Sequence, residues 1–222
     1  MNLESIVVRD YEKLKEKHMG ISILRRENQE YSISGTISLD DPDTGKIWES
    51  YSVRIIIPSL YPKELPSIYE TGNKIPKERH INNDGSCCLA PTVEMWLILG
   101  SSYTLIDFID KLVIPYLANQ KLVECGQGWN NGEYAHGGKG LLEYYKVSLK
   151  INKTDAVLNC LNNLKKISTI RKSATCYCGS GIKFKDCHES RIQKLLEIDP
   201  SLIIRDILLI ESHLKNKIYE KK

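Results

Sequence analysis

The chain has 222 residues, of which 41% are hydrophobic and 27% charged, with a formal net charge of +3 at pH 7. These values exclude a disordered chain, and the length allows one good core with an appendage or two small domains. The apolar runs are far shorter than the roughly 18 residues that span a bilayer. The first ten residues also lack the features of a secretory signal, so we expect a cytoplasmic protein without a membrane partner.

The first part of the chain has the pattern of a helix followed by a strand meander. Residues 3–18 place apolar side chains on one face at helical spacing. Three strands are expected at 20–26, 30–39 and 46–57, separated by turn-forming residues, and a short fourth at 66–70. Between the third and fourth strands, three prolines exclude a helix or a central strand.

The middle of the chain is less regular. Residues 71–103 show little periodic pattern, and an irregular stretch of that length inside a compact domain is normally functional. A helix is expected from Thr104, a suitable N-cap, and Pro115 either kinks this helix or ends it. A glycine-rich loop at 126–140 then leads to a short helix at 140–149.

The remaining part is predicted to be helical and basic. One helix is expected at 154–167, and another begins at Asp199, an N-cap followed by a proline at the first helical position. Residues 150–222 contain 15 Lys and Arg against 8 Asp and Glu, a net charge of +7, whereas residues 1–149 carry −4. This asymmetry predicts two domains, 1–149 and 150–222. The order of the expected elements predicts an α/β (α+β) protein with a small helical extension. The basic part could meet an acidic partner or nucleic acid, although such an excess usually covers a solvated surface.

The seven cysteines indicate metal binding or thiol chemistry rather than a disulfide framework, because a cytoplasmic protein is expected. Cys125 and Cys160 are isolated, and we interpret them as small buried hydrophobic residues. Cys87 and Cys88 are adjacent, in the segment His80-Ile-Asn-Asn-Asp-Gly-Ser-Cys-Cys-Leu-Ala90. Neighbouring side chains of an extended segment alternate, so these two should point in different directions.

The residues before Cys88 suit thioester chemistry. A thiol accepts an acyl group without elaborate activation. Attack by an amine then passes through a tetrahedral oxyanion, which needs a preorganised donor such as an amide side chain or a backbone N–H. Asn82 and the glycine-containing turn that follows it provide both kinds of donor. The alternative is an inert pair of cysteines in a loop.

The order of elements and these local residues together resemble the ubiquitin-conjugating enzymes over residues 3–149. That family has an N-terminal helix, a four-stranded antiparallel meander and a Tyr-Pro-x-x-x-Pro segment, matched here by residues 61–66. In the family a His-Pro-Asn signature precedes Gly-Ser-x-Cys-Leu, whose cysteine forms the thioester. The match implies that Cys88 is the catalytic cysteine and that Asn82 contacts the oxyanion. Here the signature is His80-Ile-Asn, and its spacing to the cysteine is two residues shorter than in eukaryotic members.

Shortened signatures of this kind occur in bacterial relatives, as does a similar glycine-rich loop around His136. The resemblance makes His136 a candidate base or orienting group, with a surface histidine as the alternative. Some of these relatives belong to antiphage operons, including cyclic-oligonucleotide signalling systems (CBASS), and join a protein C-terminus to a target amine.

The resemblance therefore implies a transferase whose partner is a ubiquitin-like modifier, or the C-terminus of a nucleotidyltransferase, together with a target protein. Because no glycine-rich nucleotide fingerprint follows a strand, any activating enzyme must be a separate protein. The alternative is a non-catalytic adaptor that binds protein or nucleic acid, since relatives without the cysteine are binding modules.

Residues 176–188 have the spacing of a closed metal site. Cys176 and Cys178 are separated by one residue, and after eight intervening residues Cys187 and His188 complete a set of three thiolates and an imidazole. Such a set holds a structural Zn²⁺ with no open coordination position. The string is similar to the SEC-C motif, the zinc-binding C-terminal element of the bacterial translocation ATPase SecA. The expected cofactor is therefore structural Zn²⁺, and the basic flanks suggest partner docking.

Overall fold

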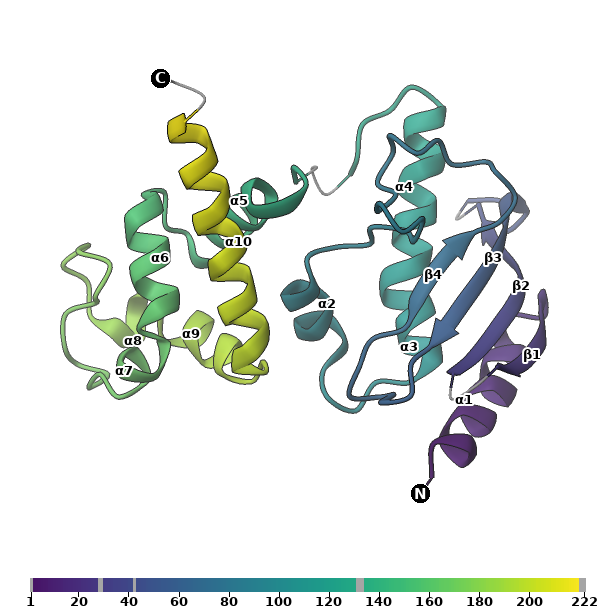
Figure 1. Cartoon of the computed structure of the whole chain (residues 1–222), viewed down its shortest axis with the longest axis horizontal. Coiled ribbons are helices and arrows are strands. Elements are labelled where there is room, and N and C mark those ends of the chain that lie inside the picture. Colours follow the sequence, from purple (N-terminus) through teal and green to yellow (C-terminus); the bar gives the residue numbers. More distant parts are fainter. Residues whose placement is uncertain (1, 28–29, 42, 131–133, 220–222) are drawn as a thin grey trace. The chain divides into compact units, whose positions relative to one another are not determined.

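The computed structural model describes residues 2–27, 30–41, 43–130 and 134–219. The chain forms two compact units, the first made of residues 1–90 and 98–132, the second of residues 91–97 and 133–222. In Figure 1 the first unit runs from purple to teal and the second is mainly green and yellow.

The first unit contains a four-stranded antiparallel sheet in the order β1-β2-β3-β4 (Figure 1). Its strands are β1 (Ile21–Glu27), β2 (Glu30–Asp40), β3 (Ile47–Ile57) and β4 (Ser67–Glu70). The two central strands alternate buried and more exposed side chains, and buried residues face one another, as Ile33 does Ile55 and Ile37 does Tyr51. This period of two is typical of strands with one buried face, and the mixed α/β class is confirmed.

Helices of the first unit pack beside this sheet. Helix α1 (Leu3–Lys17) is capped by Asn2 and buries Val7 and Leu14. Its polar anchor is Asp10, which is 1% exposed and accepts a 2.6 Å hydrogen bond from the Tyr61 hydroxyl. Tyr61 opens the Tyr-Pro-x-x-x-Pro segment, so this segment ties the crossing between β3 and β4 to the first helix.

A longer helical run contains Pro115 without ending there. It comprises α3 (Leu105–Phe108), the π-helical turn η1 (Ile109–Val113) and α4 (Ile114–Glu124). Thr104 and Asp107 form a capping box at its start, which confirms Thr104 as the N-cap. The Ile114 N–H donates to the carbonyl five residues back, at Ile109. This wider turn precedes Pro115, whose ring would clash with a carbonyl in a regular helix interior, and the run continues to Glu124.

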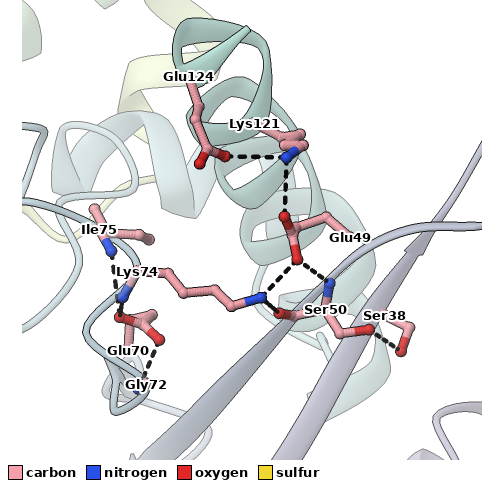
Figure 2. Close-up of polar contacts among 9 residues, drawn as sticks. All are labelled: Ser38, Glu49, Ser50, Glu70, Gly72, Lys74, Ile75, Lys121 and Glu124. Atoms are coloured by element: carbon pink, nitrogen blue, oxygen red, sulfur yellow. Dashed lines mark hydrogen bonds and ion pairs between the residues drawn. The ribbon is translucent and has the colours of Figure 1, made fainter.

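A polar network joins three elements of the first unit (Figure 2). Glu49 at the start of β3 accepts a 2.6 Å hydrogen bond from Lys74, which follows β4, and pairs at 3.0 Å with Lys121 near the end of α4. The hydrogen bond from Lys74, one from the Ser50 amide and the Lys121 contact lower the pKa of Glu49 to about 2. The carboxylate is therefore ionised at neutral pH, and it holds the sheet and α4 together.

Helix α2 (Thr92–Leu99) lies inside the stretch expected to lack regular structure. Its second half is the uninterrupted apolar run Met95-Trp-Leu-Ile-Leu99. A helix that is apolar on every side has no 3.6-residue alternation, so its sequence carries no helical period.

The second unit is helical. Its elements are α5 (Gly137–Leu149), α6 (Thr154–Asn162), α7 (Leu164–Ser168), α8 (Phe184–Cys187), α9 (Glu189–Leu196) and α10 (Pro200–Tyr219). Its core includes Tyr145, Phe184 and Ile207. The single helix expected at 154–167 is two helices, because the Asn163 side chain donates back to the Asn159 carbonyl at 2.9 Å where α6 ends. None of the described helices has the length and apolar character needed to cross a membrane.

The domain boundary expected at residue 150 lies elsewhere. Helix α5 belongs to the second unit, where it packs on α10. The two helices approach closely, since a Cβ on Gly138 would overlap the carbonyl oxygen of Leu209. The change in net charge at residue 150 therefore reflects the protein surface. The boundary between the two cores lies before α5, because the apolar face of α5 packs in the second unit. The glycine-rich loop at 126–140 falls partly on residues 131–133, which lie outside the described ranges.

Candidate thiol site and metal centre

Cys88 ends a loop that is hydrogen-bonded to itself and to the sheet. The Cys87 N–H donates to the carbonyl of Ile68 on β4 at 2.8 Å, and the Cys88 N–H donates to the His80 carbonyl, also at 2.8 Å. Ile81 and Cys87 form an isolated antiparallel bridge. The loop is therefore anchored at both ends, and the backbone of Cys88 is held in place.

The tip of the loop is a tight turn around Asn82. The Gly85 N–H donates to the Asn82 carbonyl at 2.9 Å, and the Asn82 N–H donates to the Ser86 carbonyl at 2.8 Å. Gly85 has φ 85, a left-handed conformation that glycine adopts without strain. The Asn82 side-chain amide donates to Ser86 Oγ at 3.0 Å, and that hydroxyl donates to Asp84 at 2.7 Å. Two residues of the predicted thiol site, Asn82 and Cys88, thus share one ordered loop.

The two adjacent cysteines have different surroundings. Cys87 is buried, with 7% of its surface exposed, whereas Cys88 is partly exposed. Burial raises the pKa of both thiols, and for Cys87 a hydrogen bond with Tyr116 opposes that rise. Both sulfurs are therefore protonated at neutral pH, and Cys88 is the one that is more open to a reactant.

Side chains from α4 and from the segment that follows it support the loop. The buried Tyr116 hydroxyl donates to the His80 carbonyl at 3.0 Å, the same carbonyl that holds the Cys88 amide. Gln120 donates to the Arg79 carbonyl at 2.8 Å, and the His80 ring lies edge-on to Trp129 with centroids 4.6 Å apart. The sequence shows Tyr116 only as part of a buried helical stripe. Its contact with the loop joins residues distant in the chain and carries no local signal.

The remaining predicted residues are placed as follows. His136 directly precedes α5 in the second unit and is exposed, and its role toward Cys88 stays a prediction. Cys160 is buried as expected, with its sulfur 2.9 Å from the Tyr177 hydroxyl. Cys125 was expected to be buried, and that prediction is wrong. It lies just past the last turn of α4, where the chain turns into solvent, and is exposed.

The four predicted metal ligands lie together. The sulfurs of Cys176, Cys178 and Cys187 and the ring nitrogen of His188 all lie within 4.8 Å of one another. The Sγ atoms of Cys178 and Cys187 are 3.6 Å apart, and His188 Nδ1 is 3.3 Å from Cys176 Sγ and 3.0 Å from Cys187 Sγ. A tetrahedral ion with metal–sulfur bonds of about 2.3 Å requires S···S edges of about 3.8 Å and S···N edges of about 3.5 Å. The set can therefore hold a metal ion after small adjustments.

A turn and a short helix bring the ligands together. Gly179 has φ 78, and the Cys176 N–H donates to the Ile182 carbonyl at 2.8 Å, which folds the chain back after the first pair. Helix α8 follows and presents Cys187 at its last position and His188 directly after it. The spacing in the sequence is thus that of a hairpin closed by one helical turn.

Outer contacts prepare two of the ligands. The His188 Nε2 atom lies 2.7 Å from the Leu149 carbonyl, so Nε2 carries the proton and Nδ1 offers its lone pair to the metal site. Burial lowers the pKa of His188, which keeps the ring neutral, as a ligand must be. The Ser180 hydroxyl lies 3.2 Å from Cys178 Sγ. Although burial opposes it, this contact helps to lower the pKa of that thiol.

The comparisons with known proteins agree with this metal site. The SEC-C motif matches residues 173–190, a range that includes all four ligands. No curated protein and no solved structure matches the chain.

Proposed function

We propose that the first unit is a ubiquitin-conjugating-like transferase, which forms a thioester on Cys88 and passes the acyl group to an amine. The observation that carries this proposal is the contrast within the cysteine pair. Cys87 is buried, whereas Cys88 is partly exposed on a loop whose backbone is fixed by the His80 carbonyl. A rigid loop that offers one sulfur to a reactant meets the positional requirement of nucleophilic catalysis.

In the proposed reaction the Cys88 thiol loses its proton and attacks the activated C-terminal carbonyl of a modifier, displacing the activating group. A target amine then attacks the thioester, and the Cys88 thiolate leaves. The Cys88 N–H is occupied by the His80 carbonyl, so the oxyanion donor must be another group. Asn82 suits this part, because its amide nitrogen carries two protons and the Ser86 contact uses one. His136 is proposed as the base or orienting group.

The proposed donor of the acyl group is a ubiquitin-like modifier or the C-terminus of a nucleotidyltransferase in an antiphage system. A separate activating enzyme would supply the activated carbonyl. The metal proposed for the second unit is a structural Zn²⁺, because three thiolates and one imidazole form the donor set that selects zinc and leaves no open position.

Zinc should copurify at about one equivalent per chain, the stoichiometry of a closed four-ligand site. The variant Cys176→Ser should lose most of this metal, whereas Cys125→Ser, at an exposed cysteine outside the cluster, should keep it. Elemental analysis of the purified proteins measures both. Undiminished zinc in Cys176→Ser would contradict the assignment.

The thioester is tested by producing the protein with its neighbouring genes and separating it under non-reducing conditions. A fraction should migrate as a heavier adduct that thiol reductant collapses, because a thiolate exchanges with a thioester. Cys88→Ser should abolish the adduct or convert it to a reductant-resistant oxyester, and Cys87→Ser should leave it largely intact. Asn82→Ala should slow transfer to the amine more than adduct formation, by about a hundredfold for one lost oxyanion donor.

A non-catalytic adaptor is the second candidate. It is favoured by the surroundings of Cys88, whose pKa is raised by burial, with no charged neighbour contributing to the shift. Reactive cysteines commonly have a lowered pKa. Cys88→Ala distinguishes the two functions, since an adaptor keeps its biological activity and a transferase loses it.

A further inference from the structure

A cavity of about 500 Å³ lies beside the metal cluster in the second unit. Its cationic walls are Lys150 and Lys153, from the link between α5 and α6, and Arg191 of α9. Cys178, Cys187 and His188 of the metal cluster also line it. The three cations come from two separate parts of the chain, so the fold gathers charges that the sequence keeps apart.

The backbone of Lys150 is held in an unusual conformation at this cavity. Lys150 ends α5 with φ 55 and ψ 43, the left-handed region in which glycine is the common residue at helix ends. A lysine here is strained, and strained residues concentrate where a side chain is needed at a site. The backbone conformation at this position favours glycine, yet the residue is a lysine that lines the cavity.

Arg191 is oriented by two backbone carbonyl groups. Its Nε donates to the Ser148 carbonyl at 3.1 Å and its Nη1 to the Cys187 carbonyl at 3.5 Å. These contacts leave further guanidinium protons for a ligand, and a held guanidinium fork matches the oxygens of a phosphate.

Charge balance at the cavity leaves a positive excess. Three thiolates on a divalent ion carry −1, and Asp186, which also lines the cavity, carries another −1. Against these stand the three positive charges of Lys150, Lys153 and Arg191, which leave +1. The N-terminus of α6, without a side-chain cap, adds a partial positive charge beside Ala156 at the wall.

We propose that this cavity binds the phosphate group of a nucleotide, either free or within a nucleic acid strand. A bare phosphate would leave most of the space empty, whereas the volume lies within the usual 300–1,000 Å³, approximately, of small-molecule sites. A doubly charged phosphate also uses several cations around one cavity better than a single carboxylate does. The proposal is independent of Cys88 and of the proposed transferase.

The test uses the full-length, metal-loaded protein and fluorescence anisotropy of a labelled single-stranded RNA, with AMP, ATP and inorganic phosphate as competitors. The double variant Lys150→Gly, Lys153→Ala removes two charges from the cavity, and glycine relieves the strain at position 150. The matched control, Lys165→Ala, Lys166→Ala, removes two exposed charges from α7, away from the lining residues. Both double variants should keep the unfolding temperature and the metal content of the parent protein.

The cavity variant should bind RNA about tenfold more weakly. The slope of its log binding constant against log salt concentration should fall by about one unit per lost phosphate contact. The affinity of the control variant should change by about twofold or less. Competition by ATP or AMP would identify the free nucleotide as a ligand, and failure of both would assign the phosphate to a strand. Equal losses in the two double variants would overturn the proposal, as would no binding of any phosphate probe at low salt. A labelled polyglutamate peptide is the last probe: if it binds while RNA does not, and the cavity variant loses this binding, the proposal is overturned and the cavity is assigned to an acidic peptide.

Discussion

At the scale of single residues, the second unit buries a carboxyl group in unfavourable surroundings. Asp206 of α10 is 1% exposed, and its Oδ2 accepts a 3.0 Å hydrogen bond from the Tyr145 hydroxyl. The guanidinium of Arg205 lies 3.5 Å from its Oδ1, but Arg205 is half exposed and compensates poorly for the buried charge. Burial therefore raises the pKa of Asp206 above that of an ordinary aspartate.

Asp206→Asn should stabilise the second unit at neutral pH, because it removes the burial of a charge and keeps an acceptor for Tyr145. The gain should fall within the roughly 0.5–2 kcal/mol typical of single stabilising substitutions. A raised folded-state pKa contributes stability below the unfolded pKa and loses it as pH rises through the folded pKa. The advantage of Asn over Asp should therefore grow with rising pH in urea unfolding. A variant less stable than the parent at pH 7 would contradict this.

The same scale shows what local sequence can predict. The metal ligands were found because all four lie within one short segment whose spacing determines their geometry. Cys88 and Asn82 were likewise close in sequence. Tyr116 and the Leu149 carbonyl, which support these two sites, were missed, because each acts across 36 or more residues and neither residue type signals such a contact. Cys125 was misjudged because an isolated cysteine has no pattern to distinguish a helix end from a core.

At the scale of elements, clear boundary signals decided the outcome. The strands were predicted to within one residue at each end, because turn-forming residues and prolines separate them in the sequence. Helix α2 was missed because its second half is apolar on every side, and α8 and α9 because they are short helices next to the metal turn. Helix α5 was assigned to the wrong unit, since only three-dimensional packing shows which core its apolar face joins.

The network around Glu49 yields a prediction at this scale (Figure 2). Glu49→Gln should lower the stability of the first unit at pH 7 by about 1 kcal/mol, since partly exposed ion pairs contribute about 0.2–1 kcal/mol each. Because the pKa of Glu49 is lower in the folded state, its ionised form stabilises the fold at pH values above the unfolded pKa. This stabilisation is lost as the pH falls through the folded pKa of about 2. The difference between parent and variant should thus shrink between about pH 4.5 and 2. Urea unfolding across that range measures it, and a constant difference would show that the loss is not electrostatic.

At the scale of the whole molecule, the metal cluster is part of the core of the second unit. Cys176 and Phe184 are buried in the same cluster as Leu149 and Ile207. The His188 ring contacts the Leu149 carbonyl, and Arg191 links the Ser148 and Cys187 carbonyls to α9. Metal binding should therefore order the end of α5 as well as the ligand turn, whereas the sheet of the first unit has its own core.

Removal of the metal by a chelator should consequently affect the two units differently. The ligand thiols are then no longer held together by the metal. Because metal binding is coupled to folding, the turn at 174–188 and the last turn of α5 should unfold locally. Hydrogen exchange should accelerate in both of these segments, while the paired strands β2 and β3 keep their protection. His188→Gln should reproduce part of the effect at α5 even with metal supplied, because it removes the imidazole that contacts Leu149. Unchanged exchange at α5 would show that the metal orders only the ligand turn. Faster exchange in β2 and β3 would show that the two units do not fold separately.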